Sequence, residues 1–347
     1  MTIPSILGLA TCVPEGEYSQ AKIFEYMKPF LSKNRYAETI FQKIGIATRH
    51  FVLDENYYVK GRSTQERNET YMEQAIPLGA RAIERCLDSA SVSPQEITDF
   101  TVVSCTGLDI PGLDLRLAGL LGMRPGLQRV CILGMGCYAA LPALRQVRDA
   151  VVARPGSKAL VLAVELCSLH FQLDDASNEQ VVSAALFADG AAAILLGDEV
   201  RQNKPHLLDS ATYCDYQTFD HMAFNLTNNG FRMRLSAYVP RLLSADIESF
   251  VDRLLAQNNL SRSEIRFWMV HPGSLKILDY VHERLGLPEH ALDCSRAVLQ
   301  QNGNMSSPTV LFVLNEVQQS GQPERGDYGL MLAFGPGLTL EGALVQW

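Results

Sequence analysis

Gly134-Met135-Gly136-Cys137-Tyr138-Ala139-Ala140 is the stretch around which the rest of the chain is organised. The apolar run before it, Val130-Cys131-Ile132-Leu133, predicts a buried strand, and the composition of Ala143–Val152 after it predicts a helix. The two glycines allow the tight turn that such a junction needs. Cys137 then lies at a helix N-terminus, where unpaired N–H groups lower a thiol pKa below its free value of about 8.5. It is either a nucleophile or a small buried apolar residue, and this stretch alone leaves both open.

The composition bounds what the chain can be. It has 347 residues, 47% hydrophobic and 20% charged, which predicts two domains or one large duplicated one. The net charge of -8 argues against nucleic acid or an anionic membrane as the main partner. The eight cysteines include no CxxC pair, so we expect neither a disulfide framework nor a metal site. Without a signal-peptide pattern or an apolar run near the roughly 18 residues of a membrane span, a cytoplasmic location is expected.

Strands and helices are predicted to alternate through both halves of the chain. Apolar runs predict strands at 100–105, 159–166, 191–196, 267–270 and 329–334, and helices are expected at 275–285 and 310–319. This alternation indicates an α/β fold with buried sheets. Lys204-Pro205 is the best candidate for a seam, which gives an N-terminal half of residues 1–204 and a C-terminal half of residues 205–347.

Cys137, His271 and Asn304 share one placement, since each lies where a buried element meets a turn containing glycine. Functional sites collect at such ends of α/β sheets. A reactive thiol needs an imidazole nearby, and a third polar group often assists. A histidine satisfied by backbone and an asparagine in an ordinary turn are the simpler explanations for each residue alone. The three together favour a catalytic site.

Several ordered motifs resemble those of the type III polyketide synthases, the chalcone-synthase family. Besides the elbow around Cys137, the resemblance rests on Ser104-Cys105-Thr106-Gly107, Ala185–Ala192, His271-Pro272-Gly273, Gly303-Asn304-Met305-Ser306-Ser307 and Ala333-Phe334-Gly335-Pro336-Gly337. It extends from about Arg49 to the C-terminus. There are departures: Met135, Tyr138 and Ala140-Leu141 replace the family's usual Gln, Phe and two glycines, while Ser274 and Ala333 each replace a glycine.

The resemblance implies a thiolase fold, with two pseudo-duplicated α/β halves in five layers, assembled as a homodimer. It implies that a small acyl-CoA or malonyl-CoA starter is loaded on Cys137 and extended by decarboxylative condensation with malonyl-CoA. His271 and Asn304 would donate hydrogen bonds to the thioester oxygen and the enolate. Ring closure would give a pyrone or a polyhydroxylated aromatic. No cofactor besides the CoA substrates and no metal is implied.

The resemblance also assigns substrate-binding positions. Phe187 matches one aromatic gatekeeper, and Met233 stands where the second is usually Phe. Cys105, Glu165 and Ser306 match a trio that influences how the finished chain cyclises, and Cys105 and Cys167 also resemble cysteines of bacterial synthases. The positions that line the family's cavity match His170 and Phe224, and the last glycine turn supplies Gly335 and Pro336. We expect the bulk of His170 and Phe224 to restrict the enzyme to small starters.

Three further positions are expected to contact the CoA or the partner subunit. Arg49 matches a basic position near the mouth of the CoA tunnel, and Lys276 is a second candidate there, although a solvated surface charge is as good an explanation for it. Ile110 matches a loop residue that enters the cavity of the partner subunit.

Three other functions stay open at this point. A condensing enzyme like ketoacyl synthase III shares the Cys, His and Asn, but would extend a starter once. A cysteine hydrolase would release free acid and CoA without consuming malonyl-CoA. A non-catalytic scaffold subunit is disfavoured because Cys137, His271 and Asn304 are all present.

Overall fold

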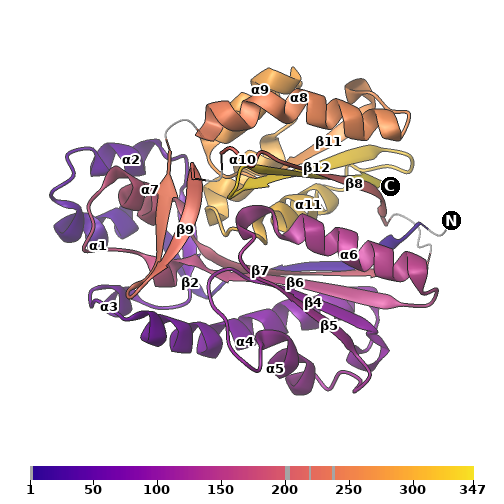
Figure 1. Cartoon of the computed structure of the whole chain (residues 1–347), viewed down its shortest axis with the longest axis horizontal. Coiled ribbons are helices and arrows are strands. Elements are labelled where there is room, and N and C mark those ends of the chain that lie inside the picture. The colour runs from indigo at the N-terminus through magenta and orange to yellow at the C-terminus, as the bar shows by residue number, and fades with distance from the viewer. Residues whose placement is uncertain (1–2, 200–203, 219, 237–238) are drawn as a thin grey trace.

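The computed structural model describes residues 3–199, 204–218, 220–236 and 239–347. Its N-terminal half is built on a sheet in the order β1-β7-β6-β4-β5 (Figure 1). The elements of this half are β1 (Ser5–Cys12), β2 (Gly16–Ser19), α1 (Gln20–Leu31), α2 (Ala37–Lys43), β3 (Thr48–Phe51), α3 (Glu55–Tyr58), α4 (Thr64–Ala90), β4 (Asp99–Val103), α5 (Leu113–Leu120), β5 (Gln128–Ile132), α6 (Ala140–Ala153), β6 (Lys158–Leu166), α7 (Asn178–Leu186) and β7 (Asp189–Gly197).

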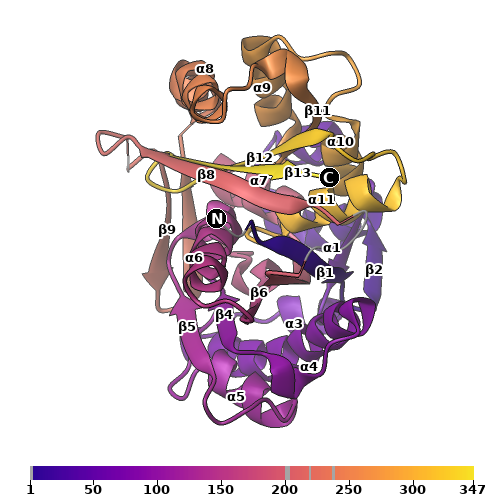
Figure 2. The same ribbon diagram turned by 90° about the vertical axis from the view of Figure 1, so that its right-hand side faces the viewer.

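The C-terminal half repeats this construction on the order β11-β12-β13-β8. A pairing of Ser5 with His206 joins β1 to β8, so the two sheets meet at this seam (Figure 2). The elements are β8 (His206–Cys214), β9 (Met222–Thr227), β10 (Gly230–Leu235), α8 (Val239–Gln257), β11 (Ile265–Val270), α9 (Leu275–Leu285), α10 (Asp293–Asn302), α11 (Thr309–Gln319), β12 (Tyr328–Gly335) and β13 (Thr339–Gln346). The exact boundary after residue 204 stays a prediction.

Five layers follow from the alternation of side chains along the strands. In β6, Leu160 and Leu162 face a core beneath α4, whereas Val161 faces a central core shared with α6 and α11. In β12, Leu330 points to a third core under α8 and α9, and Met331 points to the central one. Figure 1 shows this stack of helix, sheet, helix, sheet and helix layers. The predicted fold class, a thiolase fold of two similar halves, is therefore confirmed.

The parallel strands of each half end at the same place. β4, β5 and β6 run parallel, as do β11 and β12. Their carboxyl ends lead into Ser104, Gly134, Cys167, His271 and Pro336, which belong to the motifs found in the sequence. In α/β sheets this end is where ligands bind.

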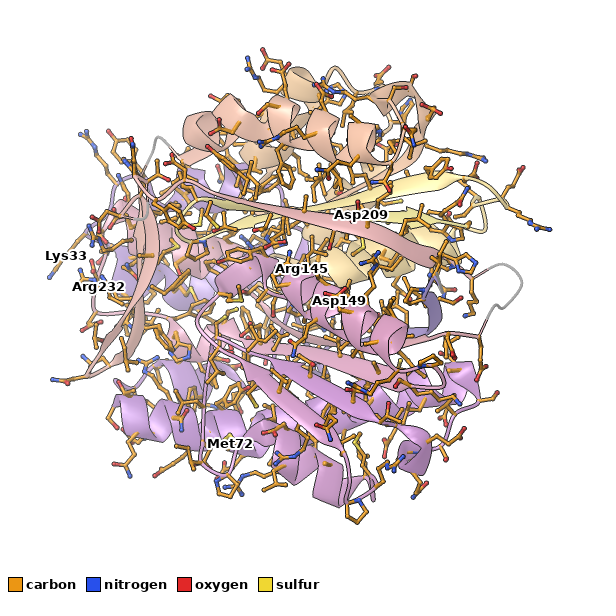
Figure 3. All side chains as sticks on the ribbon, turned by 45° about the vertical axis from the view of Figure 1, so that its right-hand side comes forward. Lys33, Met72, Arg145, Asp149, Asp209 and Arg232 are labelled. Carbon is orange, nitrogen blue, oxygen red and sulfur yellow. The ribbon has the colours of Figure 1, made fainter. Side chains whose placement is uncertain are left out.

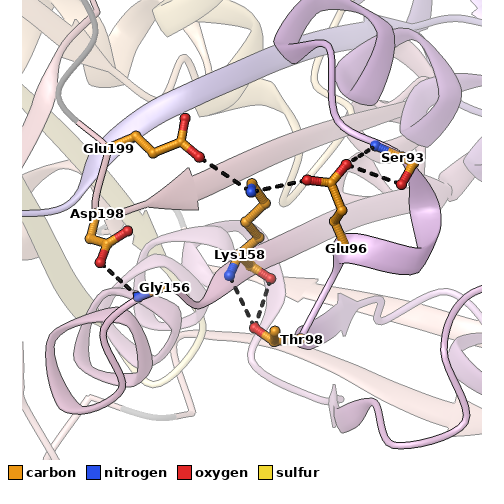
Figure 4. Close-up of polar contacts among 7 residues, drawn as sticks. All are labelled: Ser93, Glu96, Thr98, Gly156, Lys158, Asp198 and Glu199. Carbon is orange, nitrogen blue, oxygen red and sulfur yellow. Dashed lines mark hydrogen bonds and ion pairs between the residues drawn. The ribbon is translucent and has the colours of Figure 1, made fainter.

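The opposite end of the N-terminal sheet is fixed by a polar cluster around Lys158, the first residue of β6 (Figure 4). Its ammonium group pairs with Glu96 at 3.1 Å and with Glu199 at 3.2 Å. Between the two sheets lies Arg145 of α6, labelled in Figure 3. It pairs with the buried Glu341 of β13 at 3.1 Å. These contacts tie the layers together away from the strand ends that carry the motifs.

The prediction of a buried strand before the elbow is wrong for the single chain. β5 is the edge of the sheet, and most of its residues are exposed. Val130 is 37% exposed and Leu133 is 50% exposed. A strand that packs inside its own chain and a strand that packs against another molecule can have the same apolar sequence. The sequence alone therefore could not show that β5 is exposed in the single chain.

Two elements were not predicted. The first is α7, over Asn178–Leu186. The β9–β10 hairpin reaches from the C-terminal half across to the N-terminal half (Figure 1). Its tip is held there because the N–H of Thr64 donates to the carbonyl of Asn228 at 2.8 Å, and the Gln172 amide donates to Asn229 at 2.8 Å.

Candidate active site

The elbow that carries Cys137 is packed against the turn between β12 and β13. After β5 the chain makes one 3-10 turn, Gly136–Tyr138, and then enters α6. Gly136 has φ +78°, and a Cβ there would lie 2.7 Å from Cδ of Pro336. A Cβ on Gly335 would lie 2.6 Å from the Tyr138 ring. Both positions therefore require glycine, and the nucleophile candidate lies where the two halves meet.

His271 and Asn304 converge on Gly273. The Asn304 Nδ2 group donates to the Gly273 carbonyl at 3.3 Å, and a Cβ on Gly273 would lie 3.7 Å from Nε2 of His271. Asn304 Oδ1 accepts from the N–H of Ser306 at 2.8 Å. The Ser306 hydroxyl hydrogen-bonds to the Cys137 thiol. Hydrogen bonds thus link Asn304 to Cys137 through Ser306, and Asn304 also bonds the turn that follows His271.

The charge state of this group differs from the prediction. Burial raises the pKa of the Cys137 thiol to about 11, the Ser306 hydrogen bond opposes this, and the Glu165 charge adds to it. Burial alone lowers the pKa of His271 to about 3. The expectation of a thiol pKa lowered by the helix N-terminus is therefore wrong. One of the N–H groups at the elbow, that of Gly136, donates to Sγ of Cys105 at 3.0 Å, not to the nucleophile.

His271 is buried and unpaired. Only 1% of its surface is exposed, and neither Nδ1 nor Nε2 has a hydrogen-bond partner among the described residues. Unpaired polar groups in the interior are costly, and they are retained mainly where a function uses them. The imidazole is therefore available to a reacting group.

A cavity of about 780 Å³ adjoins this group through Gly136 and Ser306, whereas Cys137, His271 and Asn304 are not among the residues that line it. It is bounded by the ends of β4, β5 and β6, the first turn of α4 and the β9–β10 hairpin. Of the predicted substrate residues, those that line it are Cys105, Cys167, His170, Phe187, Phe224, Ser306 and Pro336. Its wall also includes residues that sequence reasoning missed, such as Thr64, Ser183 and Leu226. These carry no local signal, because only the tertiary fold brings them to the cavity.

The remaining predicted substrate residues lie outside this lining. Glu165 is fully buried behind it and accepts hydrogen bonds from the Cys105 N–H at 2.9 Å and the Ser307 hydroxyl at 2.8 Å. Met233 is 3% exposed and belongs to the central core. Ile110 is 91% exposed, and Gly335 lies at the elbow contact described above.

Two aromatic rings and a histidine shape one wall of the cavity. Phe187 and Phe224 pack edge to face with ring centroids 5.7 Å apart. Phe224 also pairs with Met233 across the β9–β10 ladder. The two predicted gatekeepers, Phe187 and Met233, are therefore both neighbours of Phe224. Nδ1 of His170 accepts from the Phe231 N–H at 3.2 Å, and its Nε2 lies 2.7 Å from a backbone carbonyl. Burial lowers the pKa of His170 to about 4.

The two expected CoA cations have different surroundings. Lys276 is exposed in the first turn of α9. Arg49 has no exposed surface, and its guanidinium donates to buried carbonyls. A fully buried group cannot contact a phosphate at a tunnel mouth, so the assignment of Arg49 to CoA is wrong. A basic residue in a motif does not reveal from sequence alone whether it is buried.

Two family models cover nearly the whole chain. The model of the N-terminal domain of chalcone and stilbene synthases matches residues 5–200, and that of their C-terminal domain matches residues 211–347. The chain belongs to the chalcone and stilbene synthase family. Chalcone and stilbene synthases are type III polyketide synthases, so the resemblance inferred from the motifs is confirmed.

Individual relatives agree. The chain is 33% identical to a 3,5-dihydroxyphenylacetyl-CoA synthase of Amycolatopsis balhimycina, over 99% of this chain and 93% of the relative. It is 31% identical to a 1,3,6,8-tetrahydroxynaphthalene synthase of Streptomyces peucetius subsp. caesius, over 99% and 93%. The crystal structure of PKS-I from the brown alga Ectocarpus siliculosus superposes with a TM-score of 0.94 at 30% identity, covering 99% of this chain and 98% of that one.

As a type III polyketide synthase, the chain is a condensing acyltransferase that uses malonyl-CoA. The family models favour this function over a ketoacyl synthase III-like enzyme, a hydrolase or a scaffold. Among the described residues, no group of three or more His, Cys, Asp or Glu side chains could hold a metal ion. In the same part of the chain, no helix is long and apolar enough to cross a membrane.

The contacts that shift the pKa of the Cys137 thiol can be tested by measuring its rate of alkylation with iodoacetamide over a range of pH. The alkylated protein is detected by mass spectrometry. Ser306→Ala removes the hydrogen bond that favours the thiolate, and should slow alkylation near pH 8 by about 3- to 10-fold, the worth of one such bond. Glu165→Gln removes a nearby negative charge and should accelerate it. Cys294, which is partly exposed on α10 and lies outside the proposed β5 face, serves as an internal reference in each sample. If both variants shift the rate in the same direction, the contacts assigned to the thiol are wrong.

Proposed function

We propose that the chain loads a small acyl-CoA or malonyl-CoA starter on Cys137 and extends it with malonyl-CoA. The observation that carries this proposal is the series of hydrogen bonds from Cys137 through Ser306 to Asn304, whose amide also bonds the Gly273 carbonyl in the turn after His271. In loading, the thiol sulfur attacks the thioester, the acyl group moves to Cys137, and CoA leaves as its thiol. His271 takes the proton from Cys137 and delivers it to the leaving sulfur.

The neutral resting pair is compatible with this role. Burial disfavours an isolated thiolate and an isolated imidazolium. Transfer of the proton from Cys137 to His271 creates both charges together, and their attraction in a medium of low dielectric opposes the cost of burial. An acyl-CoA thioester that excludes the remaining water strengthens that attraction. The nucleophile is therefore activated when substrate is bound.

In extension, malonyl-CoA loses carbon dioxide, and the resulting enolate carbon attacks the acyl carbonyl; the bond from the acyl group to Cys137 breaks, and the sulfur leaves as the thiolate for the next round. The product is a β-ketoacyl-CoA longer by two carbons. Nδ2 of Asn304 and the N–H of His271 would donate hydrogen bonds to the enolate oxygen, a contribution of about 3 kcal/mol per donor in other enzymes. Phe187 lines the cavity and pairs with Asn304 in an isolated β-bridge, so its apolar ring would face the carboxylate that must lose its charge.

The starter and product are proposed from the cavity wall. Phe224 packs against Phe187 and His170 lines the same space, so long acyl tails have less room beside the nucleophile. Two of the relatives are named for polyhydroxylated aromatic products, which favours a small aromatic or a short pyrone here. We propose Lys276 as a CoA contact and no cofactor besides the CoA substrates. A cytoplasmic location stays a prediction from the sequence.

We also propose that the enzyme is a homodimer formed through β5 and α5. Exposed apolar side chains gather on these elements and on the loop after β4; they are Leu108, Ile110, Leu115, Leu120, Val130 and Leu133. Leu108 and Leu133 also line the cavity, so this face and the cavity are continuous. A second copy would cover the unpaired edge of β5 and complete the cavity wall with Ile110.

Substitutions of Cys137 and Asn304 should separate loading from decarboxylation. Cys137→Ala should abolish the acyl adduct and polyketide formation while some release of carbon dioxide from malonyl-CoA survives. Asn304→Ala should lower decarboxylation and extension by about 10²- to 10³-fold, with loading affected less. Intact-protein mass and labelled carbon dioxide are the measurements. An adduct on Cys105 or Cys167, or normal decarboxylation in Asn304→Ala, contradicts the assigned roles.

Light scattering at micromolar concentration should give the mass of a dimer. Val130→Asp places a charge on the apolar face and should give monomers with reduced activity. Val59→Asp is a matched control, because Val59 is also an exposed valine but lies on another part of the surface. A fully active wild-type monomer, or a Val130→Asp variant that stays dimeric, would refute the proposed interface.

Phe224→Gly should widen the range of starters. Turnover of acyl-CoAs from acetyl to palmitoyl would be compared in the wild type and the variant. We expect the wild type to prefer short chains and the variant to gain about 10-fold or more on longer ones, because a misfit in a packed cavity costs roughly 1–3 kcal/mol. A wild type that already prefers long chains would show that Phe224 does not limit the cavity.

A further inference from the structure

The end of α7 places the gatekeeper Phe187, and its last carbonyls are covered by donors from distant segments. The final carbonyls of a helix have no partner within the helix. Here Nη1 of Arg49 donates to Ala184 at 2.7 Å and to Phe187 at 2.6 Å, and the Gln20 amide donates to Ala185 at 2.8 Å. The carbonyl that remains, that of Leu186, accepts from the N–H of Asn304 at 3.0 Å.

Arg49 and Gln20 form one unit on the small β2–β3 sheet. Gln20 begins α1 directly after β2, and Arg49 lies on β3. Nε of Arg49 donates to Oε1 of Gln20 at 3.0 Å, and both side chains are buried. A buried guanidinium is expensive, and burial lowers its pKa to about 9, with Asp189 opposing the shift. The negative end of a helix is a favourable place for the remaining positive charge.

The same unit holds the segment that carries Asn304. A Cβ on Gly303 would lie 2.9 Å from Cγ and Cδ of Arg49, so the stem of Arg49 packs directly on this glycine. Next to Arg49, the Thr48 hydroxyl donates to the Gln301 carbonyl at 2.7 Å. Arg49 therefore contacts the end of α7 on one side and the turn before Asn304 on the other.

We propose that Arg49 is a positioning residue that sets Phe187 against Asn304. The two residues share a bridge in which the Ala188 N–H donates to the Asn304 carbonyl at 2.9 Å. This inference rests on the proposed function, in which Phe187 and Asn304 serve decarboxylation. Loading depends on Cys137, which is held by a different pair of turns. Loss of Arg49 should therefore impair decarboxylation more than loading.

Arg49→Lys keeps a positive charge but loses the planar fork that reaches Gln20, Ala184 and Phe187 together. Decarboxylation of malonyl-CoA should fall by about 10- to 100-fold in kcat, as small misplacements at a reacting centre do, while the loading of Cys137 stays within about twofold. Arg148→Lys is the matched control, because Arg148 donates to the carbonyls of Leu207 and Leu208 far from the site. It should lower thermal stability without changing the ratio of decarboxylation to loading.

Gln20→Ala is a second test if Arg49→Lys folds poorly. It should lower the ratio of decarboxylation to loading, by less than Arg49→Lys does. In the double variant Arg49→Lys/Asn304→Ala the losses should not add, because Arg49 acts through Asn304 and Phe187. Normal decarboxylation in Asn304→Ala would overturn the proposed function and this inference with it. An impaired Asn304→Ala enzyme beside an unchanged ratio in Arg49→Lys and Gln20→Ala, or fully additive losses, would overturn the inference alone.

Discussion

The close approach of two turns, one from each half, is the constraint on which the rest of the site depends. Gly136 packs on Pro336 and Gly335 on the Tyr138 ring, and neither glycine has room for a Cβ. Because these turns follow the parallel strands β5 and β12, their contact holds the carboxyl ends of both sheets together. Cys137 lies within this contact, so its position is fixed by packed backbone on both sides.

Cys137 and His271 are buried beside this contact, and burial governs their charges. Glu165 is satisfied by donors from both halves, so a buried carboxylate can persist beside the thiol. The same burial holds Cys137 and His271 neutral in the absence of substrate. Donors in such surroundings act strongly on a charge that develops during reaction, because little water screens them. A Cys137–His271 pair that is uncharged at rest and a reaction that passes through an enolate are therefore two consequences of one environment.

Local sequence patterns predicted most elements and the place of the site. The helix over residues 275–285 and the strands of the central sheets follow from periodicity, and the turns after those strands gathered the motif residues. What failed depends on surroundings that no local pattern contains. β5 is apolar yet exposed, and Arg49 is basic yet fully buried. The thiol pKa likewise follows from the burial of Cys137 more than from its place before a helix.

The departures from the family's usual elbow sequence can be explained by packing. Ala140 and Leu141 replace two glycines in the first turn of α6, and both are buried in the central core. Alanine and leucine lose less backbone conformational entropy on folding than glycine does, so the first turn of α6 is more stable. Tyr138 packs on Gly335 and hydrogen-bonds to Thr339 of β13. The changes at Tyr138, Ala140 and Leu141 thus add a contact or remove backbone freedom where the halves meet, and they leave Cys137, His271 and Asn304 in place.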